Sequence, residues 1–358
     1  MISNNIKPKP YLIGETAYNH EGDYDYLVKM VDDIADLGLN AVKFHLLLNP
    51  DSYMQKQHPL KKVISKWLFN EEQWLELFEL SRSKNLDVIA LCDDVESIKF
   101  VKKIASKASI ELHSTSLNDY FMLQSLADYQ GTIYLGVGGS SLDEINEAVD
   151  FFKNNGKAKL ILMYGFQSYP TDYNQINLAK MIKLKAMFDL QVGYADHTAY
   201  DDPYNEIISA MPAAMGFNIL EKHYTPDFGK ERIDYHAAVG KEKLIKIKEL
   251  VELALIVHGN KSLGMSKPEL SYGNTGPMKK AIVAKKTIHQ GEQFSTENLW
   301  FKRTQEESSV KQIDFTKIVG LKALCDINED EIIDFTNVEY KYKSAVESDF
   351  TKLEEEKK

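Results

Sequence analysis

The chain has 358 residues, which is longer than an ordinary domain of roughly 100 to 200 residues, so we expect one large domain and a smaller one. Apolar residues make up 44% and charged residues 27% of the chain, which excludes wholesale disorder. Acidic residues outnumber basic residues by 53 to 43, and the formal net charge of −10 has the wrong sign for binding nucleic acid or an anionic membrane.

The sequence also predicts the cellular compartment. No run approaches roughly 18 consecutive apolar residues, and the opening MISNNIKPKP lacks the apolar segment of a signal peptide. We therefore expect a cytoplasmic protein without a membrane partner. Cys92 and Cys325 lie far apart and outside any metal-binding spacing, so we expect two ordinary buried thiols.

From residue 11 to residue 258, short apolar runs alternate with stretches whose apolar residues recur every three or four positions, as in alternating strands and helices. The expected strands are 11–17, 41–46, 87–91, 110–113, 132–135, 160–164, 191–194 and 218–221. One expected helix, DYDYLVKMVDDIADLG, ends at Gly38, and another starts with the capping-box pair Ser141 and Glu144. Eight such units predict a (β/α)8 TIM barrel. A doubly wound open sheet is the alternative, but no GxGxxG motif follows the first strand.

A second domain is expected after the barrel. We assign residues 1–260 to the barrel and 261–278, rich in Gly, Ser, Pro and Asn, to a linker. Residues 279–341 form a small β-rich domain, and residues 342–358 form a charged tail. The small domain contains a repeat of 39 residues, in which Ile288, Gly291, Glu292, Phe294, Asn298 and Leu299 recur as Ile327, Asp330, Glu331, Ile333, Asn337 and Val338. It is too small to bury much surface alone, so we expect it to pack on the barrel or on a partner subunit.

Polar residues at the strand ends are the candidates for chemistry, because TIM-barrel active sites lie at the C-terminal ends of the strands. These candidates are Glu15, Asn19, His20, Lys43, His45, His113, Ser114, Ser116, Gln167, Tyr169, Asp196, His197, Glu221, Lys222, His223, Asp234 and His236.

Two histidines stand out in this set. His197 and His223 end strands that are neighbours in a barrel, so their rings can converge on one point, as a Mn, Zn or Fe site requires. The pattern alone leaves open that they are only hydrogen-bonded polar groups. Asp196 and Glu221 favour the metal site, because carboxylates orient imidazoles and hold metal-bound water.

Two further features have a functional and a structural interpretation. Lys43 lies in the apolar run AVKFHL, where a buried lysine needs an anion, although it can also reach solvent from the strand end. The segment GVGGSS at 136–141 precedes a helix whose N-terminal amides can hold a phosphate or carboxylate, although such glycines often only make the turn.

Ordered segments along the chain carry a resemblance. IGETAYNHEGD is similar to IAEAGxNHNGD, GYADHT to GYSDHT, and ILEKHYT to IEKHFT, all motifs of the sialic acid (nonulosonate) synthase family. AVKF, SLDEINEAV and QSYPTDYNQINL resemble further motifs of that family. AIVAKKTIHQGEQFSTENLWFKR and the repeat after it resemble the antifreeze-like (SAF) domain that ends these proteins. The resemblance covers essentially the whole chain.

The resemblance implies an activity in surface-glycan biosynthesis. The family condenses phosphoenolpyruvate with an open-chain N-acylated hexosamine such as N-acetylmannosamine, releasing phosphate and forming a nine-carbon 2-keto acid. A divalent ion, typically Mn²⁺ with Mg²⁺ or Co²⁺ as alternatives, polarises the sugar aldehyde. Its two histidine ligands match His197 and His223.

The resemblance also assigns roles to single residues. Glu15 matches a glutamate that contacts the sugar near the metal, Lys43 a lysine near phosphoenolpyruvate, and Asp234 an aspartate that holds sugar hydroxyls. Arg303 is the candidate for an arginine that closes the site of the other subunit, which implies a domain-swapped homodimer. The expected catalytic residues are Glu15, Lys43, His197, His223 and Glu221. The expected substrate-binding residues are Asn19, His45, His113, Ser114, Gln167, Tyr169, Asp196, Lys222, Asp234, His236 and Arg303.

The chain departs from the family around the expected phosphoenolpyruvate site. Glu111 stands where the family has an anion-binding lysine, and Ser116 stands where it has a glutamate. His45, Ala195 and the segment 136–138 are further departures. A lysine-to-glutamate change alters the local charge by two units and weakens the binding of a highly charged anion.

Three hypotheses follow. The first is a metal-dependent nonulosonate synthase with a rebuilt donor pocket. The second is a metal-dependent aldolase or lyase that uses a pyruvate-type donor. The third is a catalytically silent, sugar-binding paralogue. The stretch Asp201 to Ala214 looks longer than is common in the family and is a candidate for reshaping the pocket mouth.

Overall fold

The structure is a computed structural model that describes residues 9–104, 108–166, 168, 171–260, 262–273 and 279–339. The chain divides into two compact units, residues 1–261 and 262–358. The expected charged tail lies outside the described residues.

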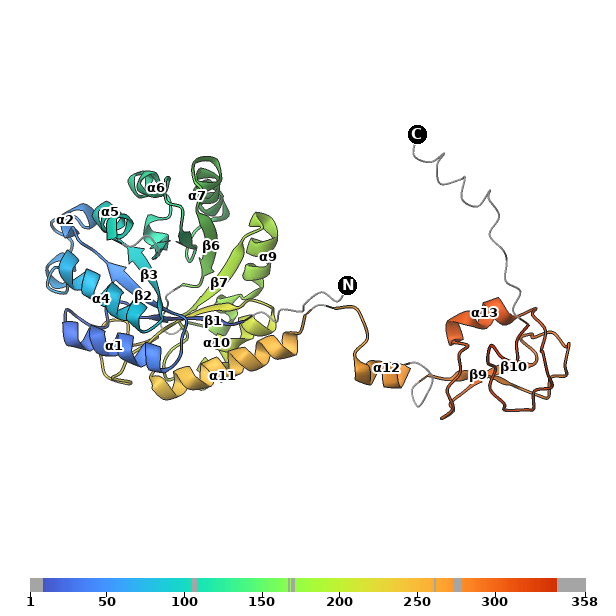
Figure 1. The fold of residues 1–358 in the computed structure, drawn as a ribbon. Coiled ribbons are helices and arrows are strands. Elements are labelled where there is room, and N and C mark those ends of the chain that lie inside the picture. Colours follow the sequence, from blue (N-terminus) through green and yellow to red (C-terminus); the bar gives the residue numbers. More distant parts are fainter. Residues whose placement is uncertain are drawn as a thin grey trace, which may run out of the picture. The chain divides into compact units, whose positions relative to one another are not determined.

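Unit 1 is built on a closed barrel of eight strands in sequential order, each parallel to its neighbours (Figure 1). The strands are β1 (Tyr11–Glu15), β2 (Ala41–Leu46), β3 (Asp87–Cys92), β4 (Ser109–Leu112), β5 (Thr132–Gly136), β6 (Lys159–Tyr164), β7 (Gln191–Asp196) and β8 (Ile219–His223). The pairing of β1 with β8 closes the barrel, so the expected TIM barrel is confirmed and the open sheet is excluded.

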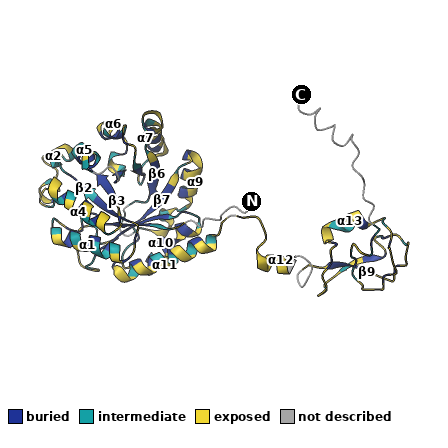
Figure 2. Ribbon diagram, viewed as in Figure 1, coloured by how far each residue is buried: buried dark blue, intermediate teal, exposed yellow. Residues whose placement is uncertain are grey.

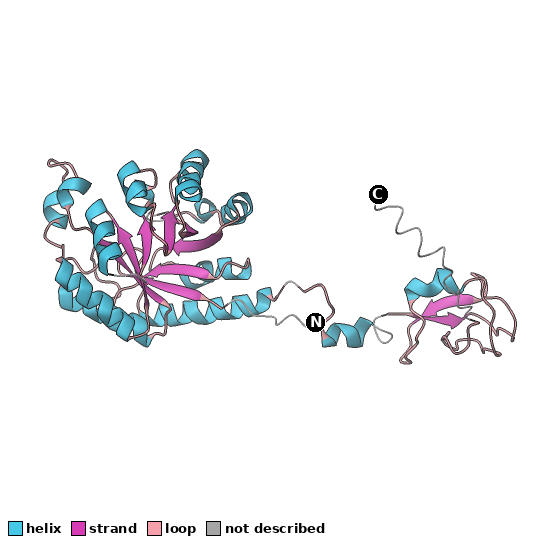
Figure 3. Cartoon of the chain, turned by 45° about the horizontal axis from the view of Figure 1, so that its top comes forward, coloured by secondary structure: helices cyan, strands magenta, loops and turns pink. Residues whose placement is uncertain are grey.

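Helices surround the barrel, as Figure 3 shows. They are α1 (Tyr24–Asp36), α2 (Pro50–Tyr53), α3 (Lys61–Ile64), α4 (Glu71–Ser83), α5 (Val95–Ile104), α6 (Tyr120–Leu126), α7 (Leu142–Asn155), α8 (Tyr173–Ile176), α9 (Ala179–Phe188), α10 (Asn205–Ala214) and α11 (Lys241–His258). A short 3₁₀ turn, η1 (Ser114–Ser116), follows β4. The expected capping box at Ser141 and Glu144 is present at the start of α7.

The alternation of side chains along the strands produces two apolar layers. Residues on the outer face of the strands pack against the helices and form the main core, visible as the dark blue between strands and helices in Figure 2. Residues on the inner face form a smaller cluster that fills the barrel: Ile13, Ala41, Ile89, Tyr134, Ile161, Met163, Ala195 and Ile219. The polar inner-face residues lie beyond this plug, toward the C-terminal ends of the strands.

Two segments differ from expectation. The stretch Asp201 to Ala214 is largely occupied by α10, which packs on α11 as a regular barrel helix. The expected linker contains a helix, α12 (Lys267–Gly273), whose start is supported by the Ser266–Glu269 capping interaction. This helix was not predicted because the surrounding segment is rich in Gly and Ser, which are typical of linkers.

Unit 2 contains β9 (Ala281–Ala284), β10 (Leu299–Lys302), the 3₁₀ turn η2 (Gln312–Asp314) and α13 (Phe315–Ile318). Its sequence repeat is a structural repeat, because Ile288 and Ile327 pair across a bridge and Gly291 and Asp330 both adopt left-handed backbone conformations. Buried apolar residues from both repeats, including Phe294 and Ile333, form a separate hydrophobic core in unit 2. This unit therefore buries more of its own apolar surface than its size suggested.

Two remaining expectations concern the thiols and the membrane. Cys92 is buried as expected, but Cys325 is exposed, so its assignment as a buried thiol was wrong. Cys325 lies two positions from buried Ala323 and from buried Ile327, but its own side chain faces solvent. Within the described residues, no helix has both the length and the apolar character needed to cross a membrane.

Candidate active site

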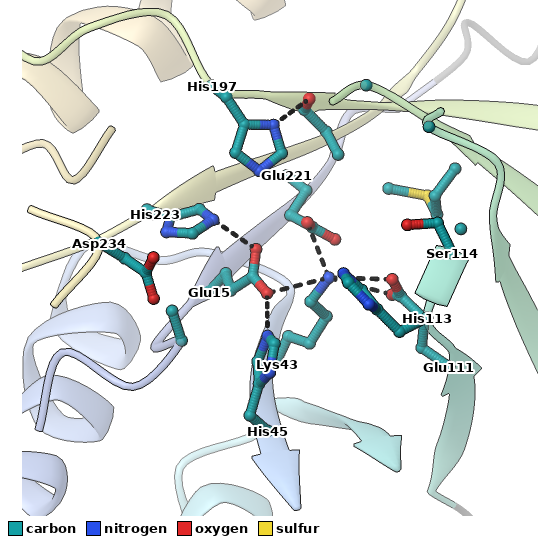
Figure 4. Close-up of a pocket in the computed structure, with 16 residues that line it drawn as sticks. Glu15, Lys43, His45, Glu111, His113, Ser114, His197, Glu221, His223 and Asp234 are labelled. Carbon is teal, nitrogen blue, oxygen red and sulfur yellow. Dashed lines mark hydrogen bonds and ion pairs between the residues drawn. The ribbon is translucent and has the colours of Figure 1, made fainter. Parts of the chain in front are cut away.

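A pocket lies at the C-terminal ends of the barrel strands (Figure 4). Seven of the eight strands contribute residues spaced by two positions, because every second residue points to the inside of the barrel. These pairs are Glu15 and Ala17, Lys43 and His45, Glu111 and His113, Gly136 and Gly138, Met163 and Gly165, Ala195 and His197, and Glu221 and His223. Ser114 and Asp234 complete the lining of a cavity of about 80 Å³.

His197 and His223 face each other at one side of the pocket, with ring centroids 5.0 Å apart. The Nδ1 of His197 lies 3.1 Å from the carbonyl oxygen of Ala195, and the Nε2 of His223 lies 3.0 Å from a carboxylate oxygen of Glu15. Burial and the proximity of His223 lower the pKa of His197 to about 3, so its ring is neutral at neutral pH.

Lys43 lies at the centre of the pocket and contacts three carboxylates (Figure 4). Its Nζ is 2.7 Å from Glu221, 3.1 Å from Glu15 and 3.1 Å from both oxygens of Glu111. All four side chains are at most 4% exposed. Lys43 therefore does not reach solvent, and the anions that permit its burial are carboxylates of the protein itself.

The carboxylates around Lys43 differ in their pKa. Burial raises the pKa of Glu15, but Lys43 and His223 outweigh burial and bring it well below its ordinary value. Burial and the charge of Glu15 raise the pKa of Glu221 well above its ordinary value, and burial also raises that of Glu111 despite the nearby ammonium. One lysine cannot fully compensate the burial of three carboxylates.

Two further histidines extend the pocket beyond Lys43. His45 lies between two carboxylates, with Nε2 3.0 Å from Glu15 and Nδ1 3.8 Å from Asp93. Burial opposes its protonation, but Asp93 and Glu15 raise the pKa of His45 to about 10. Burial and the charge of His45 lower the pKa of His113 to about 4. At neutral pH the pocket therefore holds one protonated and one neutral imidazole next to Lys43.

Glycines in the loops after β5 and after β6 allow the strand ends to approach closely. A Cβ on Gly138 would lie 1.8 Å from the carbonyl oxygen of Gly165, and a Cβ on Gly165 would lie 1.9 Å from that of Ala195. Any side chain would clash with backbone at these positions. Gly138 in GVGGSS is thus required by packing, and Ser141 caps α7 instead of facing the pocket.

Three buried residues that were expected to bind substrate lie outside the pocket lining. Asn19 donates to the carbonyl oxygen of Ile233 and accepts from the hydroxyl of Tyr26. Asp196 and Lys222 form a fully buried ion pair with an Nζ–Oδ2 distance of 2.7 Å. The alternation along β7 and β8 was the signal that sequence reasoning overlooked, because it places Asp196 and Lys222 on the outer face while their neighbours face inward.

The remaining candidates have different places. Asp234 is half-buried and lies beside His223 in the pocket, with its backbone in the left-handed region at φ 62°. His236 is exposed and packs on the ring of Tyr235. Arg303 is exposed and follows β10 in unit 2. Gln167 and Tyr169 lie outside the described residues.

The donor set at the histidine pair fits a divalent metal ion. When His197 donates Nδ1–H to the carbonyl oxygen of Ala195, its Nε2 keeps a lone pair that can bind a metal ion. When His223 donates Nε2–H to Glu15, its Nδ1 keeps such a lone pair. That Nδ1 is buried and has no hydrogen-bond partner. Among the described residues, no three His, Cys, Asp or Glu side chains are grouped as a metal site, so water and substrate would have to supply the other ligands.

Comparison with known proteins gives the family. The sequence model of the NeuB family matches residues 30–262, which is more than half of the chain. The chain belongs to the NeuB family. The sequence model of the SAF domain matches residues 279–339, in unit 2.

Similar proteins are named as synthases of sugar acids. The N,N'-diacetyllegionaminic acid synthase of Campylobacter jejuni is 27% identical over 340 residues, covering 91% of this chain and 99% of that protein. A pseudaminic acid synthase of the same species is 23% identical and covers 90% of this chain and 95% of that protein. The crystal structure of the N-acetylneuraminic acid synthetase of Leptospira borgpetersenii matches with a TM-score of 0.68 and 27% identity, over 74% of this chain and 90% of that one.

Proposed function

We propose that this NeuB-family chain condenses phosphoenolpyruvate with the aldehyde of an N-acylated hexosamine to form a nine-carbon 2-keto sugar acid. C3 of the donor forms the new bond to the aldehyde carbon, water adds at C2, and phosphate leaves. The proposal is carried by the His197–His223 pair beside Glu15, which the barrel places in one pocket at its C-terminal rim. Relatives named as legionaminic and pseudaminic acid synthases support it.

A divalent ion, most simply Mn²⁺, belongs to this proposal. His197 and His223 would hold the ion, which would supply Lewis acidity for the aldehyde carbonyl. Glu15 keeps the Nε2–H of His223 engaged and thereby fixes the tautomer of that ring. Asp234 lies in the pocket next to His223 and would accept hydrogen bonds from sugar hydroxyls.

Lys43 and the protonated His45 are the cations available to a donor carboxylate or phosphate. Lys43 would have to exchange part of its contact with Glu111 or Glu221 for the donor. We further propose a homodimer in which Arg303 of one subunit serves the site of the other subunit.

The test is phosphate release by purified protein given Mn²⁺, phosphoenolpyruvate and a panel of N-acylated mannosamines and related dideoxyhexoses. We expect release with at least one acceptor, and His197→Ala should lower it by at least about a thousandfold. The control is His289→Ala, which removes an exposed histidine of unit 2 and should change nothing. Release that persists in His197→Ala would contradict the role of the histidine pair.

A pyruvate-type donor is the second candidate, and the three carboxylates around Lys43 favour it. Such a donor carries only one negative charge and meets less repulsion from Glu15, Glu111 and Glu221. A proton would leave its C3, a carbon–carbon bond would form to the aldehyde, and no phosphate would be released. A 2-keto acid product formed from pyruvate, without phosphate, would replace the first candidate. Ligand binding without either product would indicate a silent paralogue.

A further inference from the structure

The ends of β7 and β8 are joined on the side that faces away from the pocket. Asp196 and Lys222 are register partners across the two strands, and each directly precedes one of the paired histidines in sequence. Their side chains are 0% and 1% exposed, with Nζ and Oδ2 2.7 Å apart. The same carboxylate oxygen accepts a hydrogen bond of 2.5 Å from Ser209 on α10, so the pair lies between the barrel and its helical layer.

The other carboxylate oxygen of Asp196 fixes the residue on the far side of His197. It accepts hydrogen bonds from the backbone N–H of Thr198 at 2.9 Å and from its hydroxyl at 2.6 Å. The Lys222 ammonium also donates to the carbonyl oxygen of Thr198 at 3.3 Å. His197 is thus held between two residues that belong to one buried network.

We propose that the Lys222–Asp196 pair is a positioning clamp that ties β7 to β8 directly behind the histidine pair and fixes the separation of the two imidazole rings. Burying an ion pair costs solvation free energy, and an apolar pair of similar volume often stabilises a fold as well or better. Stability alone therefore gives no reason for an ion pair here. Its value for metal binding rests on the proposed function, whereas its effect on the rings does not.

The principal variant is Lys222→Met, which removes the ammonium and keeps most of the side-chain length. Ser209→Ala removes one hydrogen bond from Asp196 and tests the same clamp more mildly if the methionine variant fails to fold. The control is Val149→Ala, a fully buried site on α7, the helix between β5 and β6, which should destabilise the barrel and leave the Lys222–Asp196 pair intact.

The first readout needs no metal and no turnover. The imidazole NMR signals of His197 and His223 are followed in histidine-labelled full-length protein. Each signal is assigned by its loss in His197→Ala or His223→Ala. We expect both signals to shift or split in Lys222→Met, to move less in Ser209→Ala and to stay in place in Val149→Ala. Unchanged signals in folded Lys222→Met, or in Ser209→Ala where Lys222→Met does not fold, would overturn the clamp.

The second readout is Mn²⁺ affinity, measured by electron paramagnetic resonance of the free ion. We expect Lys222→Met to weaken Mn²⁺ binding by about tenfold or more and Val149→Ala to change it by less than about twofold. Equal affinity in Lys222→Met and wild type would reject the effect of the clamp on metal binding. Wild-type protein that binds no Mn²⁺ would contradict the metal role in the proposed function, and the ring signals would still decide the clamp.

Discussion

Strands β7 and β8 and strands β1, β2 and β4 reach the same pocket but place their charged side chains differently. On β7 and β8 the ion pair of Asp196 and Lys222 lies on the outer face and uncharged His197 points inward, although Glu221 of β8 also points inward and contacts Lys43. On β1, β2 and β4 the charges of Glu15, Lys43 and Glu111 lie inside the pocket and contact each other. Under the proposed function the histidine side would hold a metal ion, whereas Lys43 on the other side is already paired with carboxylates of the protein.

The difference indicates where this chain is specialised. On the histidine side, the buried Nδ1 of His223 has no hydrogen-bond partner, so under the proposed function it is available to a cation. The lysine side must release at least one carboxylate before a donor anion can contact Lys43. The donor, more than the metal, is therefore expected to distinguish this protein from its relatives.

The largest expected effect comes from removing the central cation. Lys43→Met leaves three buried carboxylates without their ammonium, so we expect a loss of about 3–5 kcal/mol in the free energy of unfolding. Urea unfolding at neutral pH measures it, and adding Glu111→Gln to the same chain should restore part of the loss. A loss below about 1 kcal/mol would show that the three carboxylates are protonated at little cost in free energy. The lysine side of the pocket would then be as uncharged as the histidine side.

The second prediction uses two histidines near the lysine side, of which His20 is neutral and His45 is protonated in the folded protein at neutral pH. Burial lowers the pKa of His20 from 6.5 to about 3. Between these pH values the unfolded chain binds a proton at His20 and the folded chain does not, so stability falls as the pH falls. Asp93 and Glu15 raise the pKa of His45 from 6.5 to about 10 against the effect of burial, so the folded chain keeps a proton above pH 6.5 that the unfolded chain releases. Stability from these two groups should therefore fall on both sides of pH 6.5, each by up to ~1.4 kcal/mol per pH unit.

Two variants separate these contributions. His20→Asn should flatten the acid side, by about 2 kcal/mol between pH 6.5 and 5, and His45→Gln should flatten only the alkaline side. Thermal and urea unfolding at several pH values measure both slopes. If His20→Asn keeps the wild-type acid slope, His20 does not stay neutral in the folded protein.

The third prediction concerns the donor. Glu111→Gln removes one carboxylate charge beside Lys43 and keeps the size of the side chain, so we expect the KM for phosphoenolpyruvate to fall by about tenfold, equivalent to ~1.4 kcal/mol. The KM for the hexosamine should stay unchanged. Glu147→Gln on the exposed face of α7 is the control for a change in overall charge. A fall for pyruvate equal to that for phosphoenolpyruvate would show that the pocket does not discriminate by donor charge.

Much of the fold followed from local pattern. Each barrel strand lies within two residues of its expected bounds, because buried parallel strands are marked by short apolar runs between helical periods. The histidine pair could be predicted because β7 and β8 are adjacent in any barrel of this order. Helix α12 could not be predicted because it lies in a polar segment without periodicity, and the exposure of Cys325 could not because Ala323 and Ile327 on either side of it are buried.

The partners of Lys43 required the closed barrel. Glu15, Glu111 and Glu221 are separated from Lys43 by 28 to 178 residues of sequence, and only the register of the strands brings them to one level. Sequence reasoning treated Glu111 as a lost anion ligand but did not place it against Lys43. It also assigned Asp196 and Lys222 to the substrate, although the two-residue alternation within each strand turns them outward.

The smallest expected effect concerns the loop that joins β5 to α7 at the donor side of the rim. Ser141 accepts from the N–H of Glu144, and Glu144 accepts from the N–H of Ser141, so both side chains are engaged in capping. Ser141→Ala should lower the free energy of unfolding by about 1 kcal/mol and leave the KM of either donor unchanged. Thermal unfolding and donor titration of the same preparation measure the two quantities. A higher KM for phosphoenolpyruvate in this variant would contradict the prediction. It would show that the start of α7 contacts the donor and binds its phosphate.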